Sequence, residues 1–108
     1  MSGIVTVYTT FADAEEALRI ARVLVDERLA ACANILAPCT AIYRWQGSIE
    51  EAQEVPALFK TRADLASRLM ERLAELHSYD VPAAVAWPIV DALPAYAAWL
   101  STETKEPA

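Results

Sequence analysis

Two segments of this sequence are apolar on both of their alternating faces, and they constrain the fold more than any other feature. The segments run from Ile4 to Thr9 and from Ala84 to Val90. A strand with apolar side chains on both faces is typical of a sheet that is covered on both sides. The chain must therefore bury both faces of its sheet.

Helical patterns follow the first of these strands and precede the second. Asp13, with Glu16 three residues later, predicts an N-cap and its reciprocal partner at the start of a helix. Apolar residues then fill one half of the helical wheel as far as Leu29. A second amphipathic helix is predicted from a cap at Thr61 to about His77, and a short third helix over residues 92–102.

Between the two main helices the chain is predicted to form a long antiparallel hairpin. Residues 32–43 and 49–60 have extended patterns, and residues 45–48 between them contain Gly47 for the turn. Pro38 and Pro56 each lack a ladder donor, so we expect them at edges, bulges or bends.

The predicted order is βαββαβ followed by a terminal helix. This α+β order is the ferredoxin-like pattern, in which both main helices cover one face of an antiparallel sheet, within a single domain over residues 1–108. The third helix is too short to cover the other face. Because 56% of the residues are hydrophobic, we expect that face to be buried by self-association.

The charge balance argues against several classes of partner. A formal net charge of −6, without a dense lysine or arginine cluster, makes nucleic acid and anionic membrane poor partners. No apolar run approaches the roughly 20 residues of a membrane span. The start, Met1 to Gly3, has no basic region typical of a signal peptide, so we expect a cytoplasmic protein. Two cysteines make no disulfide framework.

His77, Cys39 and Cys32 are the candidate metal ligands. His77 is the only histidine, which excludes any site within one chain that needs two imidazoles. Thiolate and imidazole, with a carboxylate such as Glu50 or Glu54, suit copper or zinc. The alternatives are structural: a buried Cys32, a more open Cys39 without a ligand role, and His77 as a helix cap.

Two other features admit both a structural and a functional interpretation. The acidic residues Glu50, Glu51 and Glu54 form either a solvated strand edge or a lip that attracts cations. For Tyr43 and Trp45 beside the turn there are three alternatives: they pack on a neighbouring subunit, they stack on a ligand, or they belong to the core of their own chain. No glycine-rich phosphate loop and no specified nucleophile is present. A small oligomeric enzyme with His77 and Tyr79 as acid/base groups is also conceivable, but no residue pattern supports it.

Several blocks of the sequence, in this order, resemble the CutA divalent-cation-tolerance family. They are Leu29-Ala30-Ala31-Cys32-Ala33-Asn34-Ile35, Ile42-Tyr43-Arg44-Trp45-Gln46-Gly47, Ile49-Glu50, Glu54, Lys60-Thr61, His77-Ser78-Tyr79-Asp80-Val81-Pro82 and Trp99-Leu100. The resemblance runs from the first strand to Trp99. It implies a ferredoxin-like subunit in a tight homotrimer, with the hairpin reaching across to neighbours and an architecture shared with PII-type signalling proteins.

The resemblance also implies a role in tolerance of copper and other divalent cations. Family members with a copper site use a cysteine in the first strand and two consecutive histidines before Pro-Tyr. Here Thr9, Leu76 and Ser78 stand at three of these positions and only His77 matches. Gln46 and Ala83 also stand where many members have Glu. The expected site is therefore a weak one for copper or another divalent cation.

The leading hypothesis is a trimeric, non-enzymatic protein of divalent-cation tolerance. Its ligand, a divalent cation or a small molecule, would bind in clefts between subunits lined by Lys60, Glu54, Tyr43, Trp45 and Tyr79. The alternative is a PII-like signalling trimer that senses a small anion through Lys60 and regulates a partner protein.

Overall fold

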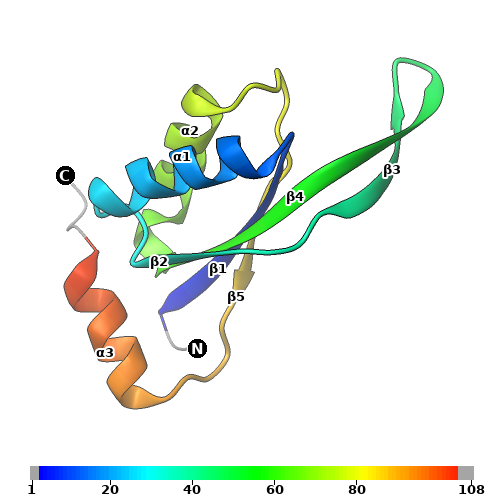
Figure 1. The fold of residues 1–108 in the computed structure, drawn as a ribbon. Helices are drawn as coiled ribbons and strands as arrows, with labels where there is room; N and C mark the ends of the chain where they lie inside the picture. Colours follow the sequence, from blue (N-terminus) through cyan, green and yellow to red (C-terminus); the bar gives the residue numbers. More distant parts are fainter. Residues whose placement is uncertain (1–2, 105–108) are drawn as a thin grey trace.

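The longest strand, β4 (Ser48–Arg62), connects the whole sheet because three other strands pair with it. It lies antiparallel to β1 (Ile4–Phe11) on one side, and to β2 (Cys32–Ile35) and then β3 (Cys39–Trp45) on the other (Figure 1). β5 (Ala84–Pro88) pairs with β1, which gives the order β2-β4-β1-β5. The computed structural model describes residues 3–104. Met1 and Ser2, on which the signal-peptide prediction partly rests, lie outside the described residues.

The predicted extended segment 32–43 is divided into two strands at a bend. Residues 36–38 separate β2 from β3, and the Leu36 N–H donates to the Pro56 carbonyl at 2.9 Å. The N–H and C=O of one residue in an antiparallel ladder point the same way. The donor that Pro56 lacks therefore faces the break, where no regular ladder bond is needed. The prediction of an edge, bulge or bend is confirmed for Pro38, which lies in the break between β2 and β3, but not for Pro56, which lies inside β4 and pairs with Thr10 of β1.

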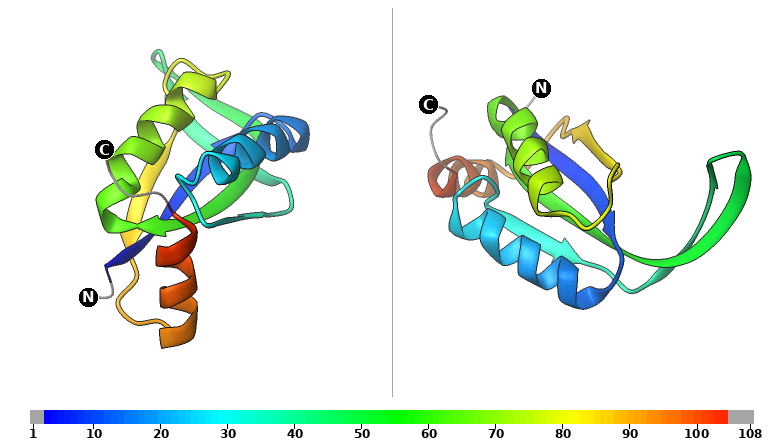
Figure 2. Two further views of the ribbon diagram at one scale, coloured as in Figure 1. Left: turned by 90° about the vertical axis from the view of Figure 1, so that its left-hand side faces the viewer. Right: turned by 90° about the horizontal axis from the view of Figure 1, so that it is seen from above.

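The hairpin of β3 and β4 projects from the rest of the molecule. Trp45 pairs with Ser48, and the two residues between them, Gln46 and Gly47, have φ of 49° and 82°. Two consecutive positive φ values are characteristic of a type I′ turn, whose twist matches that of the flanking strands. Figure 2 shows this ribbon curving away from the body, and the molecule reaches 44 Å along its longest axis.

Two helices cover one face of the sheet, α1 (Ala14–Asp26) and α2 (Ala66–Leu76). The predicted cap of α1 is confirmed, because the Glu16 N–H donates to Asp13 Oδ1 at 2.8 Å. The predicted cap at Thr61 is wrong. Thr61 lies inside β4, its hydroxyl donates to the Leu29 carbonyl at 2.7 Å, and a 3₁₀ turn, η1 (Ala63–Leu65), leads into α2.

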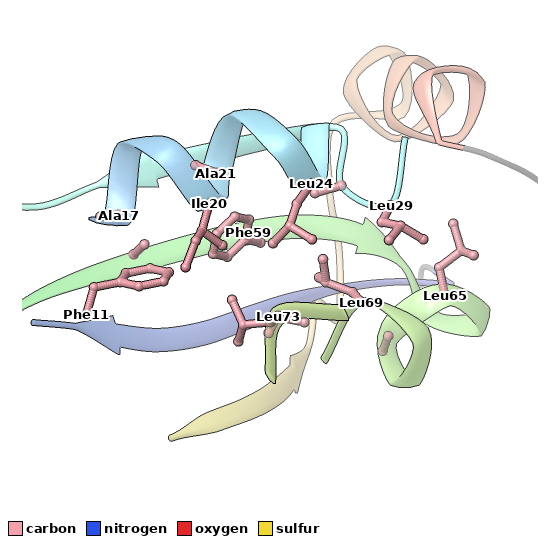
Figure 3. Close-up of a cluster of buried hydrophobic side chains, with 14 of the residues drawn as sticks. Phe11, Ala17, Ile20, Ala21, Leu24, Leu29, Phe59, Leu65, Leu69 and Leu73 are labelled. Atoms are coloured by element: carbon pink, nitrogen blue, oxygen red, sulfur yellow. The ribbon is translucent and has the colours of Figure 1, made fainter. Parts of the chain in front are cut away.

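The core lies between these helices and the sheet (Figure 3). Alternate residues of β1, such as Val7 and Phe11, point into it, and so does Phe59 of β4. The helices contribute their apolar stripes, mainly Ala17, Ile20, Leu24, Leu69 and Leu73. Burial of this apolar area is the main term that stabilises the body of the chain.

The opposite face of the sheet is largely uncovered, as predicted. Tyr8 and Trp87 stack on it with ring centroids 5.2 Å apart, yet Trp87 remains 48% exposed. The last helix, α3 (Pro94–Glu103), packs at one end of the sheet, where Leu100 meets Ile4 and Ala31. No helix within residues 3–104 is both long and apolar enough to cross a membrane.

The Arg28 side chain links α3 to the body. Arg28 follows α1 with a φ of 62°, and its guanidinium donates to the Thr102 carbonyl in the last turn of α3 at 2.6 Å. A cation at the carboxyl end of a helix is favourable because terminal carbonyls lack partners there. Arg28 thus caps the carboxyl end of a helix that lies far from it in the sequence.

Candidate functional site

A cavity of about 420 Å³ lies between the hairpin and the segment that follows α2. Its two walls come from alternate residues of the hairpin and from residues 79–83, with Thr10 of β1 between them. The hairpin residues that line it are Ala41, Tyr43, Trp45 and Glu54. The facing wall comprises Tyr79, Asp80, Val81 and Ala83. A volume of this size is within the range of small-molecule sites.

The strand pleat explains why these hairpin residues share one face. Side chains alternate across a strand, so Ala41, Tyr43 and Trp45 point to one side of β3. Cys39 and Glu54 lie opposite each other in the register, which places Glu54 on that same face of β4. Ile42 lies on the other face of the hairpin. The hairpin therefore has an inner face toward the cavity and an outer face away from it.

A hydrogen bond from Tyr79 to Glu54 joins the two walls of the cavity. The Tyr79 hydroxyl donates to Glu54 Oε2 at 2.9 Å. Burial, and then this contact with the Glu54 carboxylate, raises the pKa of Tyr79 to about 12. Tyr79 is thus a neutral donor near pH 7, and it fixes one carboxylate oxygen of Glu54 in the cavity wall.

His77 lies buried behind Tyr79, and both of its ring nitrogens have partners. Nε2 lies 2.8 Å from the Thr10 carbonyl, and Nδ1 accepts from the Tyr79 N–H at 3.0 Å. A carbonyl can only accept, so Nε2 must carry the proton of a neutral imidazole. The ring also stacks on Phe11 with centroids 5.0 Å apart. A metal ion on His77 would have to replace one of these hydrogen bonds.

Glu16 fixes the start of the segment that forms the second wall. Its carboxylate is buried and accepts from the Ala12 N–H at 3.1 Å and the Ser78 N–H at 2.8 Å. Burial alone would raise the pKa of Glu16, but the hydrogen bonds from Ser78 and Ala12 outweigh it and lower that pKa. The sequence pattern identified Glu16 only as a partner in the helix cap.

The two cysteines lie in different strands. Cys32 in β2 lies 3.4 Å from the Tyr96 hydroxyl of α3, a contact that together with burial raises the pKa of Tyr96 to about 12. Cys39 begins β3, opposite Glu54. Both thiols are free. Within residues 3–104, no three of the histidine, cysteine and acidic side chains are grouped as metal ligands.

Lys60 is the one predicted cleft residue that does not line this cavity. Its Nζ donates to Asn34 Oδ1 at 2.6 Å, and Lys60 pairs with Cys32 in the sheet register. The strand rise of about 3.3 Å per residue places Lys60 roughly 20 Å from Glu54 along β4. The other four predicted residues, Glu54, Tyr43, Trp45 and Tyr79, do line the cavity.

Sequence reasoning missed the rest of the lining. Thr10 and Ala41 are small residues whose type and spacing mark no site, and Ala83 was noted only as standing where many family members have Glu. Asp80 and Val81 follow Tyr79 directly, and this adjacency to a predicted cleft residue could have identified them as part of the lining. Among the described residues, the lining contains the two carboxylates Glu54 and Asp80 and no lysine or arginine.

Comparison with known proteins confirms the resemblance seen in the sequence. The model of the family described as CutA1 divalent ion tolerance protein matches residues 5–103. The divalent-cation tolerance protein CutA of Pyrococcus horikoshii is 49% identical over 102 residues, which cover 94% of this chain and 99% of that protein.

Solved structures agree with the sequence comparison. The divalent cation tolerance protein from Thermus thermophilus superposes with a TM-score of 0.91 at 44% identity, covering 94% of this chain and 99% of that one. A protein from Archaeoglobus fulgidus, described as a periplasmic divalent cation tolerance protein, gives a TM-score of 0.91 at 33% identity with the same two coverages. The family match and the identity of these relatives show that the chain belongs to the CutA1 divalent ion tolerance family.

Proposed function

We propose that this chain acts in divalent-cation tolerance as a homotrimer that carries out no reaction of its own. The main observation that supports self-association is the uncovered sheet face, where Trp87 is 48% exposed and Val85 is also exposed. Exposed apolar patches of this kind are typical of protein interfaces. A closed cyclic assembly buries the same patch in every copy without leaving one free.

The hairpin offers a second apolar surface to a neighbour. Ile42 and Ile49 lie on its outer face and are each 69% exposed. A two-stranded ribbon is marginal on its own, so contact with a second subunit would stabilise it. In this proposal the hairpin reaches over a neighbouring copy, and the cavity on its inner face lies close to the boundary between subunits.

The trimer is tested by comparing two variants with equally exposed apolar side chains. Trp87→Glu places a charge on the uncovered face, and Leu18→Glu places one on the outer side of α1, where Leu18 is also 48% exposed. We expect sedimentation equilibrium to show a trimer for the native chain and Leu18→Glu, and a monomer for Trp87→Glu. A monomeric native chain would contradict the proposal.

The metal role is proposed for His77, Cys39 and Cys32, as weak binding of copper or another divalent cation. The support is the chemistry of thiolate and imidazole, which favour these ions, and the family to which the chain belongs. Weakness is expected because the His77 nitrogens already have partners and the two cysteines lie at separate positions in the sheet register.

Calorimetric titration with Cu²⁺ tests the metal role. The native chain is compared with His77→Ala and with a Cys32→Ser, Cys39→Ser double variant, after circular dichroism has shown that each is folded. Loss of a saturable site in either variant supports the proposal. Equal, nonspecific binding by all three proteins would overturn it.

A second candidate function, a PII-like signalling trimer that takes a small ligand and regulates a partner protein, is favoured by one observation. This is the cavity of about 420 Å³ with Tyr43, Trp45 and Tyr79 in its walls. A ligand that binds only the native state stabilises it by RT ln(1 + [L]/Kd) and so raises the melting temperature. A thermal-shift screen of small metabolites separates this candidate from a purely metal-binding role.

We also propose a cytoplasmic location, for which the two free thiols give some support because reduced cysteines suit a reducing compartment. The relative from Archaeoglobus fulgidus is described as periplasmic. Cell fractionation of the host that makes this chain distinguishes the two locations. Recovery in the periplasmic fraction would contradict the proposal.

A further inference from the structure

The cavity beside the hairpin combines aromatic side chains with carboxylates and contains no basic group among the described residues. Tyr43, Trp45 and Tyr79 supply the rings, and Glu54 and Asp80 supply the negative charge. We infer that this cavity binds an organic ammonium ion, a cation whose charge is spread over alkyl groups. The inference rests on the proposed function only in taking the cavity as a ligand site.

The aromatic rings favour a cation because their faces carry partial negative charge. A cation within about 6 Å of a tryptophan or tyrosine ring is stabilised, most strongly where water is excluded. In the single chain Trp45 and Tyr43 are 45% and 41% exposed, so the chain's own side chains leave part of each ring uncovered. Both come from the inner face of the hairpin, as the strand pleat requires.

The Glu54 carboxylate gives the cavity a fixed negative charge. Tyr79 donates to one of its oxygens at 2.9 Å and so orients it against the second wall. Asp80, which follows Tyr79 in the same wall, adds a second carboxylate. A small anion is disfavoured by this arrangement, because Lys60, the cation on which an anion site would depend, bonds to Asn34 elsewhere in the sheet.

An organic cation suits the cavity better than a bare metal ion. Metal ions need several nitrogen, oxygen or sulfur ligands at short distance, and no group of three such side chains is present within residues 3–104. Aromatic carbon and the methyl groups of Ala41, Ala83 and Val81 offer no coordination but do favour alkyl groups. A volume of about 420 Å³ also far exceeds what a single ion fills.

The experiment uses choline as the probe, with 3,3-dimethylbutan-1-ol as its neutral isostere. The two molecules have nearly the same shape, but the central atom is a positively charged quaternary nitrogen in choline and a neutral quaternary carbon in the alcohol. We expect the native, assembled protein to bind choline in a saturable manner, about tenfold or more tightly than the alcohol, in calorimetry. Equal binding of the two probes, or no binding of choline, would overturn the inference.

Two variants locate the site. Glu54→Gln removes the charge but keeps an oxygen that accepts from Tyr79, and we expect choline binding to fall about tenfold. Glu51→Gln is the matched control, because Glu51 carries the same charge on the outer face of the same strand and should leave binding within about twofold. Equal losses in the two variants would show general charge attraction and overturn the assignment.

Trp45→Leu tests the aromatic contribution separately from the charge. Leucine keeps an apolar wall but removes the ring, so affinity for choline should fall while affinity for the alcohol stays nearly constant. A parallel fall for both probes would contradict a specific interaction between the cation and the ring.

The outcomes also separate this inference from the proposed function. A trimeric mass and a saturable copper site, without choline binding, overturn only the organic-cation assignment. A monomeric mass and nonspecific copper binding, with selective choline binding that depends on Glu54, overturn the proposed tolerance trimer and leave this site standing.

Discussion

The body of the chain and its hairpin are built on one continuous strand but stabilised in different ways. In the body, β4 is flanked on both sides by other strands and covered by α1 and α2, so Phe59 is completely buried. In the hairpin, the same strand has β3 as its one neighbour, and Ile49 is 69% exposed. The difference shows that the body is held by a buried core, while the hairpin supplies exposed surface, which we have proposed for a ligand and a neighbouring subunit.

The comparison can be tested most strongly by truncating one side chain in each half of β4. Phe59→Ala opens a cavity in the core, and we expect it to lower the free energy of unfolding by about 3–5 kcal/mol. Ile49→Ala on the outer face of the hairpin should cost less than about 1 kcal/mol when both truncations are made in the Trp87→Glu background, where no neighbour is expected to cover Ile49. Urea denaturation of both variants measures the two losses. Comparable losses would mean that the hairpin is packed as tightly as the body.

The second test concerns Glu16, which ties the body to the wall of the cavity. Glu16→Gln keeps the size of the side chain but weakens the acceptors for Ser78 and Ala12, and should cost about 1–2 kcal/mol near pH 7. Chemical denaturation against pH measures this loss.

The pH dependence of that loss follows from the direction of the shift. The pKa of Glu16 is lower in the folded chain than its ordinary value of 4.5. Its stabilisation is therefore fully present above that ordinary value and is lost as pH falls through the lowered folded value. The native chain and Glu16→Gln should thus converge in stability in acid. A difference that stays constant with pH would contradict a role for the ionised carboxylate.

The smallest expected effect is at the hairpin turn. Gln46 has a φ of 49°, a conformation that asparagine adopts more readily than glutamine. Gln46→Asn should raise the free energy of unfolding by about 0.5 kcal/mol. Gly47→Ala, at a φ of 82°, is the opposite control and should lower it by about 1 kcal/mol. If Gln46→Asn lowers the free energy of unfolding, the positive φ at residue 46 is not what limits the stability of the turn.

Much of the fold followed from local patterns. Asp13 and Glu16 predicted the start of α1 because a cap depends on residues a few positions apart. Thr61 was misread because a cap residue and a strand residue look alike without the pairing that extends β4 to Arg62. Which element a threonine joins is decided here by its register with Val5 of β1, a contact between distant parts of the chain.

The site was only partly predictable for the same reason. Tyr43, Trp45 and Glu54 share one face of a hairpin, which spacing and turn position can indicate. Lys60 was predicted to share a cleft between subunits with these residues; within one chain, the length of β4 separates it from Glu54, and it bonds to Asn34. The contacts of His77 with Thr10 and of Glu16 with Ser78 depend on how α2 ends over the sheet.

The break between β2 and β3 has a consequence for how the chain tolerates being cut. Residues 36–38 are exposed, whereas the strands on either side of them both pair with β4. A protease that nicks the backbone there would leave β2 and β3 paired with the same uncut strand. The two fragments should therefore stay together without a covalent link, and separately produced pieces divided at this bend should reassemble on mixing.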